Sequence, residues 1–219
     1  MDESAGPGLA LTEDVPTPHG AARIHVHDCA EPRGGLVLGG GASGGVAAAD
    51  LRVVRDVALD QRCNVTLVEQ PYRVAGRRAP APPRQLDAAW TAVIVKLRER
   101  MLEGLPLITG GRSMGARVAC RTAAQTNAAA VLCPAFPLHP PGRREAGRRP
   151  SRIEELTMFD APCLIVQGTR DPFGMPPAGA NRAVVKVDAD HSLKSDLDAV
   201  AGAVGDWLRA VLDGKLCRS

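Results

Sequence analysis

The chain contains few aromatic side chains and almost no excess of charge. Phe, Trp and Tyr together make up 3% of its 219 residues, and its formal net charge is +3 at pH 7. Proteins that bind nucleic acid present a strongly basic surface, and those that bind single strands add aromatic rings on which the bases stack. The composition therefore gives no support for a nucleic-acid partner.

Long apolar runs and paired cysteines are also missing. No apolar segment approaches the roughly 20 residues that cross a bilayer, and the acidic residues 1–8 lack the basic and apolar regions of a signal peptide. The six cysteines lie far apart without a C-x-x-C pair, which is typical of reduced thiols rather than of disulfides or zinc ligands. We therefore expect a cytoplasmic protein without a membrane partner.

Short apolar segments alternate with helical patterns along most of the chain. Strands are predicted over residues 22–26, 34–38, 63–68, 105–110, 128–133, 163–167 and 183–187, and helices over 46–59, 86–102, 116–121, 152–158 and 195–212. This alternation predicts an α/β fold with a doubly wound, mostly parallel sheet. The length fits one domain, so we expect a polar lead over residues 1–20 and a single domain over 21–219.

The most informative segment is the G-x-S-x-G sequence at residues 111–115. It lies between a predicted buried strand and a predicted helix, which is the setting of a nucleophile elbow, where glycines make room for a sharp turn. Ser113 would then stand at a helix N-terminus, where free amides and the helix dipole stabilise negative charge. Such a segment also arises by chance in a chain with 23 glycines, so it needs a base and an acid beside it.

Two residues follow in the order that an elbow serine requires. In such a site the serine comes first in the chain, the acid (Asp or Glu) second and the base (His) third. The acid and the base each lie at the carboxyl end of a later strand. Asp171 follows the strand predicted over residues 163–167, and His191 follows that over 183–187. His191 would take the serine proton, and Asp171 would orient the imidazole.

Each of these two residues also has a plainer interpretation. Asp171 precedes Pro172 and is suited to a turn, and His191 fits a solvated loop before the last helix. Asp188 and Asp190 are rival acids, although Asp190 is adjacent in sequence to His191, and such a neighbour rarely turns back to hold the imidazole.

Acyl transfer also needs backbone donors for the developing oxyanion. The first would be the amide of Met114, the residue after the serine. The second would come from the glycine-rich residues 39–45, most plausibly from the amide of Gly41 or Ala42, since glycines let a backbone approach closely.

Two cofactor interpretations compete with this one. The glycine-rich loop also satisfies G-x-G-x-x-G, the pattern of dinucleotide binding, with Glu69 as a candidate ribose partner. His25 and His27 share one face of an early strand, a pattern that suits metal ligands but more often marks a solvated edge.

The remaining candidates would line a pocket beside the serine. They are Gly40, His139 and Arg112, with Arg112 and Arg117 able either to bind a substrate anion or to form salt bridges along the helix. The basic residues 143–149 have the same two interpretations, an anion site or a solvated loop.

Four separated motifs, taken in order, resemble a small α/β-hydrolase family. It is a dienelactone-hydrolase-like branch that includes a testis-expressed protein and a regulatory subunit of a histone acetyltransferase complex. The resemblance covers about residues 34–193, and its motifs are residues 110–117, 136–142, 166–174 and 190–192. It implies the hydrolase fold without a large cap, and it carries Ser113, Asp171 and His191 into the triad positions.

The chain departs from this family in its oxyanion loop. The family usually has a His-Gly-Ala-Gly-like sequence there, whereas this chain has Gly40-Gly41-Ala42-Ser43, which keeps the amides and loses a side chain. The loop at residues 143–149 is also longer and more basic than the resemblance implies.

We therefore expect a serine hydrolase, esterase-like in its chemistry, that forms an acyl-enzyme on Ser113 from a small-molecule ester, thioester or amide. Such a reaction requires no metal or organic cofactor. The alternative is a non-catalytic interaction module with the same fold and a protein partner. The residues do not specify the acyl group.

Overall fold

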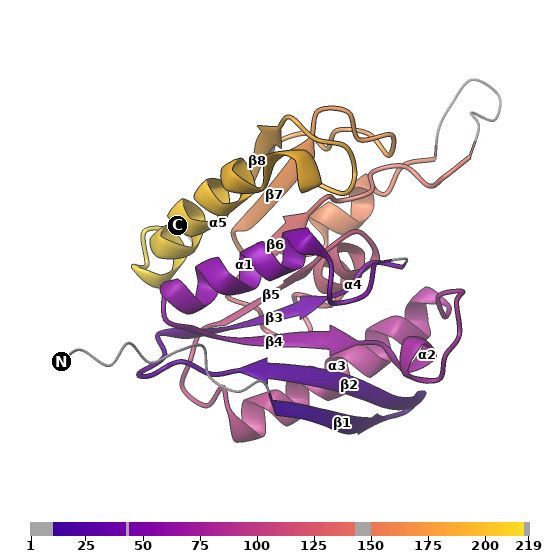
Figure 1. The fold of residues 1–219 in the computed structure, drawn as a ribbon, viewed down its shortest axis with the longest axis vertical. Coiled ribbons are helices and arrows are strands. Elements are labelled where there is room, and N and C mark those ends of the chain that lie inside the picture. The colour runs from indigo at the N-terminus through magenta and orange to yellow at the C-terminus, as the bar shows by residue number, and fades with distance from the viewer. Residues whose placement is uncertain (1–10, 43, 143–149, 217–219) are drawn as a thin grey trace.

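An eight-stranded sheet runs through the molecule in the order β1-β2-β4-β3-β5-β6-β7-β8. The computed structural model describes residues 11–42, 44–142 and 150–216 (Figure 1). Strand β2 is antiparallel to both of its neighbours, β1 and β4. All other neighbouring strands, from β4 to β8 in the sheet order, are parallel. The mostly parallel sheet expected from the alternation is confirmed. The strands are β1 (Leu11–Thr17), β2 (Gly20–His27), β3 (Gly34–Gly39), β4 (Cys63–Glu69), β5 (Leu107–Gly111), β6 (Ala130–Pro134), β7 (Cys163–Gly168) and β8 (Arg182–Val187).

Helices cover both faces of this sheet. One face carries α1 (Ala49–Asp60) and α5 (Leu197–Leu212), and the other carries α2 (Pro71–Val74), α3 (Pro83–Arg100) and α4 (Met114–Thr122). The short 3-10 helices are η1 (Ile153–Thr157) and η2 (Lys194–Asp196). The α-helices of the described ranges therefore pack against the sheet, and these ranges form no separate cap domain. Within the same ranges, no helix has both the length and the apolar character to cross a membrane.

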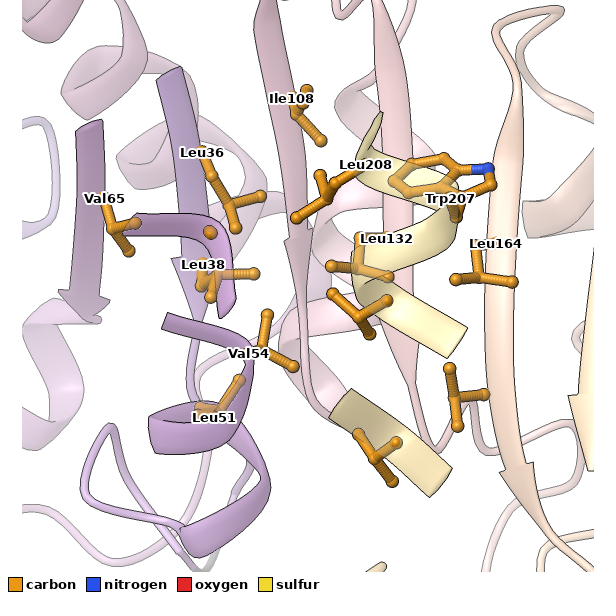
Figure 2. Packing of buried hydrophobic residues seen from close by; sticks show 14 of the residues in the cluster. Leu36, Leu38, Leu51, Val54, Val65, Ile108, Leu132, Leu164, Trp207 and Leu208 are labelled. Carbon is orange, nitrogen blue, oxygen red and sulfur yellow. The ribbon is translucent and has the colours of Figure 1, made fainter. Parts of the chain in front are cut away.

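Two cores form because successive side chains of a strand point to opposite faces. In β7, Leu164 and Val166 enter the core under α1 and α5, whereas Cys163 and Ile165 face the core under α4. Figure 2 shows the first core, with Trp207 and Leu208 of α5 packed over the strand residues. The central strands β3, β5, β6 and β7 are buried along their whole length, which explains why they are continuous apolar runs in the sequence.

The N-terminal part of the sheet differs from the sequence prediction. The lead expected up to Gly20 contains β1, which pairs with β2 over its whole length. Only Val15 of β1 is buried, because an edge strand keeps most of its side chains in water, so its sequence lacks a clear apolar pattern. The strands predicted over residues 22–26 and 34–38 are present as β2 and β3, and β4 lies between them in the sheet.

Candidate active site

Ser113 lies on the sharp turn between β5 and α4. Its backbone has φ +55° and ψ −107°, a combination that is strained for any residue other than glycine. A Cβ on Gly111 or on Gly115 would collide with the carbonyl oxygen of Gly39, the last residue of β3. The two glycines of the motif are therefore required by the close approach of a neighbouring strand, as the elbow interpretation predicts.

The structure brings Ser113, His191 and Asp171 together through two hydrogen bonds. Ser113 Oγ lies 2.9 Å from His191 Nε2, and Asp171 Oδ2 lies 2.7 Å from His191 Nδ1. The side chain of Asp171 is 1% exposed and that of His191 is 16% exposed. A proton can therefore pass from the hydroxyl to the imidazole while the buried carboxylate holds the ring.

Asp171 is held by residues that sequence reasoning did not find. Gln167 Nε2 donates to Asp171 Oδ2 at 2.8 Å, and the amide of Phe173 donates to Oδ1 at 2.8 Å. The Phe173 ring also meets the His191 imidazole edge-on, with 4.5 Å between centroids. Gln167 is a fully buried polar residue in an otherwise apolar strand, and that contrast is the sequence signal that could have revealed it.

The two rival acids lie elsewhere. Asp190 Oδ1 accepts hydrogen bonds from the amide and the hydroxyl of Ser192, and these bonds hold the pKa of Asp190 below its usual value. Asp188 is exposed and pairs with Arg170. Neither carboxylate is placed against the imidazole as Asp171 is.

The candidate oxyanion donors lie next to the serine. Met114 is the first residue of α4, so its amide has no partner within the helix and lies at the positive end of the helix dipole. A Cβ on Gly41 would lie only 3.6 Å from Ser113 Cβ, so the glycine loop (residues 39–45, of which 43 is not described) passes beside the nucleophile at Gly41.

The path of the glycine loop is constrained from within. An isolated bridge joins Gly41 and Gly45, and a Cβ on Gly40 would lie 2.8 Å from the Gly45 carbonyl. Arg73 Nη1 donates to the carbonyl oxygen of Ala42 at 2.9 Å. Gly40 is thus a packing residue of the loop, and Ser43 lies outside the described residues.

Arg112 does not line an open pocket. Its side chain is 10% exposed and forms an ion pair with Asp50, with 2.8 Å between Nε and Oδ2. Arg117 pairs with Glu155 instead of remaining free. Of the two interpretations, an anion site or a salt bridge, both arginines fit the salt bridge.

His139 lies beside the loop that carries the acid. Its amide donates to the carbonyl oxygen of Phe173 at 2.8 Å, and its Nδ1 donates to that of Pro150 at 2.8 Å. The imidazole lies against Gly174. His139 is half-buried at this position, and residues 143–149, the candidate anion site, lie outside the described residues.

One residue of the metal interpretation, His25, contacts the candidate ribose partner of the dinucleotide interpretation, Glu69. His25 Nε2 lies 2.7 Å from Glu69 Oε1, and His25 Nδ1 lies 3.2 Å from Thr12 Oγ1. Burial is the main cause that lowers the pKa of His27. Across the described ranges, no group of three or more His, Cys, Asp or Glu side chains is arranged to hold a metal ion.

Buried thiols are poor competitors for the role of nucleophile. Burial is the main cause that raises the pKa of Cys63, to about 12, and the pKa of Cys120. The pKa of Cys133 is raised mainly by its hydrogen bond with Cys120, whose sulfur lies 3.5 Å away. A thiol that stays protonated reacts slowly. The Ser113 hydroxyl, in contrast to these thiols, lies 2.9 Å from an imidazole nitrogen, Nε2 of His191.

Comparisons with known proteins agree on one fold. The sequence model of the alpha/beta hydrolase domain matches residues 32–200. A lidless α/β serine hydrolase from Xanthomonas campestris is 18% identical, with a TM-score of 0.69 over 93% of this chain and 95% of that one. Est1E from Butyrivibrio proteoclasticus is 13% identical, with a TM-score of 0.74 over 92% and 99%.

A dienelactone hydrolase from Anabaena variabilis is also similar. It is 15% identical, with a TM-score of 0.72 over 91% of this chain and 96% of that one. No curated protein sequence matches the chain. At these identities, the solved structures establish the shared architecture.

Proposed function

The chain belongs to the alpha/beta hydrolase domain family, and we propose that it is a serine hydrolase that cleaves a small-molecule ester, thioester or amide. The observation that carries the proposal is the continuous hydrogen-bonded chain from Ser113 Oγ through His191 to Asp171 Oδ2. These three groups lie in the order, the spacing and the burial that a serine nucleophile with a base and an orienting carboxylate needs.

In the first half of the reaction, Ser113 Oγ attacks the carbonyl carbon of the substrate. The serine proton moves to His191 Nε2, and the carbonyl π electrons move onto oxygen to give a tetrahedral intermediate. When the intermediate collapses, the bond to the leaving group breaks and the imidazolium returns its proton to that group. The acyl group stays on Ser113 as an ester.

The oxyanion of the intermediate would be bound by backbone amides. Met114 supplies one amide at the start of α4, and Gly41 or Ala42 supplies a second from the glycine loop that passes beside Ser113. Each donor of this kind accelerates acyl transfer by about 10²- to 10³-fold. This proposed site uses backbone amides alone, so it does not depend on the histidine found in this loop in the family that the chain resembles.

Water completes the cycle by the same route. His191 takes a proton from a water molecule, the hydroxide attacks the acyl-enzyme, and Ser113 regains its proton when the acid product leaves. Throughout, Asp171 stabilises the imidazolium, and Gln167 and the Phe173 amide keep the carboxylate in place.

An ester is the substrate class that we favour, since a Pyrococcus furiosus esterase is among the solved structures that share the fold. A cavity of about 500 Å³ opens beside Ala42 of the glycine loop, and Glu69, Arg73, Arg77 and Arg78 are among its lining residues. We propose that a polar part of the substrate occupies this space. A panel of esters graded in chain length and polarity would identify the preferred acyl group.

Three broader expectations stay proposals. They are a single domain, which includes β1 of the expected lead as well as residues 21–219, a cytoplasmic location, and a place in the branch with the testis-expressed protein and the histone acetyltransferase subunit. The five described cysteines are free thiols, and this supports a reducing compartment.

Labelling with a fluorophosphonate probe tests the proposal directly. We expect one adduct, located on Ser113 by mass spectrometry, and no adduct on the Ser113→Ala variant. Heat-unfolded protein is the control, because labelling should need the folded triad. A folded wild-type chain that gains no adduct would favour the non-catalytic interaction module instead.

A further inference from the structure

Arg112 is a buried arginine in the elbow turn between β5 and α4. It occupies the variable position directly before Ser113, and its side chain is only 10% exposed. Arginine is almost never buried to this degree unless its charge is paired. The contacts of Arg112 therefore indicate what its burial achieves.

The charge of Arg112 is balanced by Asp50 in the first turn of α1. Arg112 Nε lies 2.8 Å from Asp50 Oδ2, and the Asp50 side chain is 1% exposed. Burial raises the pKa of Asp50, and the nearby guanidinium opposes that rise. A buried ion pair of this kind contributes little to stability compared with apolar residues of the same volume. Stability alone thus does not account for the pair.

The rest of the guanidinium reaches two segments of the active site. Arg112 Nη2 donates to the carbonyl oxygen of His191 at 3.2 Å. A Cβ added to Gly41 or to Gly44 would lie 3.1 Å from Arg112 Nη1. One side chain therefore lies beside the glycine loop, pairs with the start of α1 and donates a hydrogen bond to the histidine loop (residues 188–193).

The backbone of Arg112 is itself fixed to the elbow. Its amide donates to the carbonyl oxygen of Gly39 at 3.0 Å, and its carbonyl oxygen accepts from Gly115 at 2.9 Å. Arg112 is therefore part of the turn that carries Ser113, and its side chain also holds the backbone of His191. Because a displacement of about 1 Å can cost a hundredfold in rate, this link has a catalytic consequence.

We infer that Arg112, with Asp50 as its counter-ion, is a positioning residue that holds the histidine loop and the glycine loop in register with Ser113. Its catalytic consequence rests on the proposed hydrolase function. Arg112 does not bind substrate, because Asp50, His191 and the glycine loop already surround its guanidinium.

The test compares Arg112→Met with a matched control, Arg121→Met. Arg121 lies on α4, is 12% exposed and pairs with Asp87 at 2.6 Å, but its partners are on α3 and η1. We expect Arg112→Met to lower kcat on an activated ester by about 10- to 100-fold, the range for a hydrogen bond to a charged group. KM should change by less than about threefold, and Arg121→Met should leave kcat within about threefold.

A double variant separates positioning from stability. Arg112→Met alone leaves Asp50 buried without a partner, and this can destabilise the fold. In Arg112→Met with Asp50→Leu, both charges are replaced by apolar groups, so we expect the Tm to return toward that of the wild type while kcat stays low. If kcat recovers together with the Tm, Arg112 is only structural and the inference is wrong.

Hydrogen exchange provides a readout that does not depend on activity. Arg112→Met should speed amide exchange in the histidine loop, residues 188–193, whereas Arg121→Met should not. Unchanged exchange there overturns the inference. If the wild-type chain neither hydrolyses esters nor labels at Ser113, the proposed function fails, but the exchange result still decides whether Arg112 holds this loop.

Discussion

Two histidines of this chain each bridge a carboxylate and a hydroxyl, yet only one stands in an active-site setting. His191 joins Asp171 to Ser113 at 2.7 and 2.9 Å. His25 joins Glu69 to Thr12 at 2.7 and 3.2 Å, across the outer strands β4, β2 and β1 (Figure 1). The same three kinds of group, at similar distances, thus occur twice in one molecule.

The difference lies in what surrounds each set. Asp171 is 1% exposed, whereas Glu69 is 26% exposed, so water weakens the electrostatic effect of the second carboxylate. Ser113 stands on a strained turn at the start of α4 beside the glycine loop, whereas Thr12 is an exposed residue of an edge strand. A hydroxyl, an imidazole and a carboxylate become a candidate catalytic site only where burial and backbone donors accompany them.

Replacing the two histidines tests this comparison most severely. We expect His191→Ala to lower kcat on an activated ester by about 10⁴- to 10⁶-fold, because Ser113 loses its base. His25→Ala should leave kcat within about twofold. Steady-state kinetics of both purified variants measure the contrast, and a full loss of activity in His25→Ala would reverse it.

The two carboxylates should differ by somewhat less. Asp171→Asn keeps the size of the side chain but removes the charge that stabilises the imidazolium, so we expect kcat to fall by about 10³- to 10⁴-fold. Glu69 lines the proposed substrate cavity, so we expect Glu69→Gln to change KM, whereas kcat on a small activated ester should stay within about twofold. An Asp171→Asn variant with full activity would mean that another carboxylate orients His191.

The setting of the serine can be tested without touching the triad. A Cβ on Gly115 collides with the backbone of Gly39, so we expect Gly115→Ala to lower the free energy of unfolding by about 3 kcal/mol, as overpacking does, and to reduce kcat. The control is Gly202→Ala in α5, where no atom lies within 4 Å of the new Cβ. That variant should be more stable by about 0.5–1 kcal/mol. Urea denaturation of both variants measures the difference.

The strands and helices around the site were predictable because their sequences have a strong local pattern. The buried central strands are unbroken apolar runs, and the elbow, the acid and the base follow β5, β7 and β8 in the expected order. Strand β1 was not predicted, since its polar side chains are stabilised by pairing with β2 rather than by burial.

Gln167 and Arg112, which contact triad residues, have a weaker sequence signal than the triad itself. Gln167 appears in the sequence as one polar residue at the end of an apolar strand, and its contact with Asp171 depends on how the following turn folds back. For Arg112 the sequence indicates two roles, an anion ligand or a salt bridge along the helix. Its partners Asp50 and His191 are 62 and 79 residues away in the chain, so no local pattern connects them.

The sequence by itself determined the order of the elements, the turn at Ser113 and the choice of Asp171 and His191 as candidates. These features follow from local sterics and from the alternation of apolar and polar residues. The tertiary structure decided which of the two histidines has a buried carboxylate, and that Arg112 faces Asp50 and the histidine loop instead of the solvent. Burial and contacts between distant segments arise only when the sheet is assembled, because each depends on residues that the neighbouring sequence does not specify.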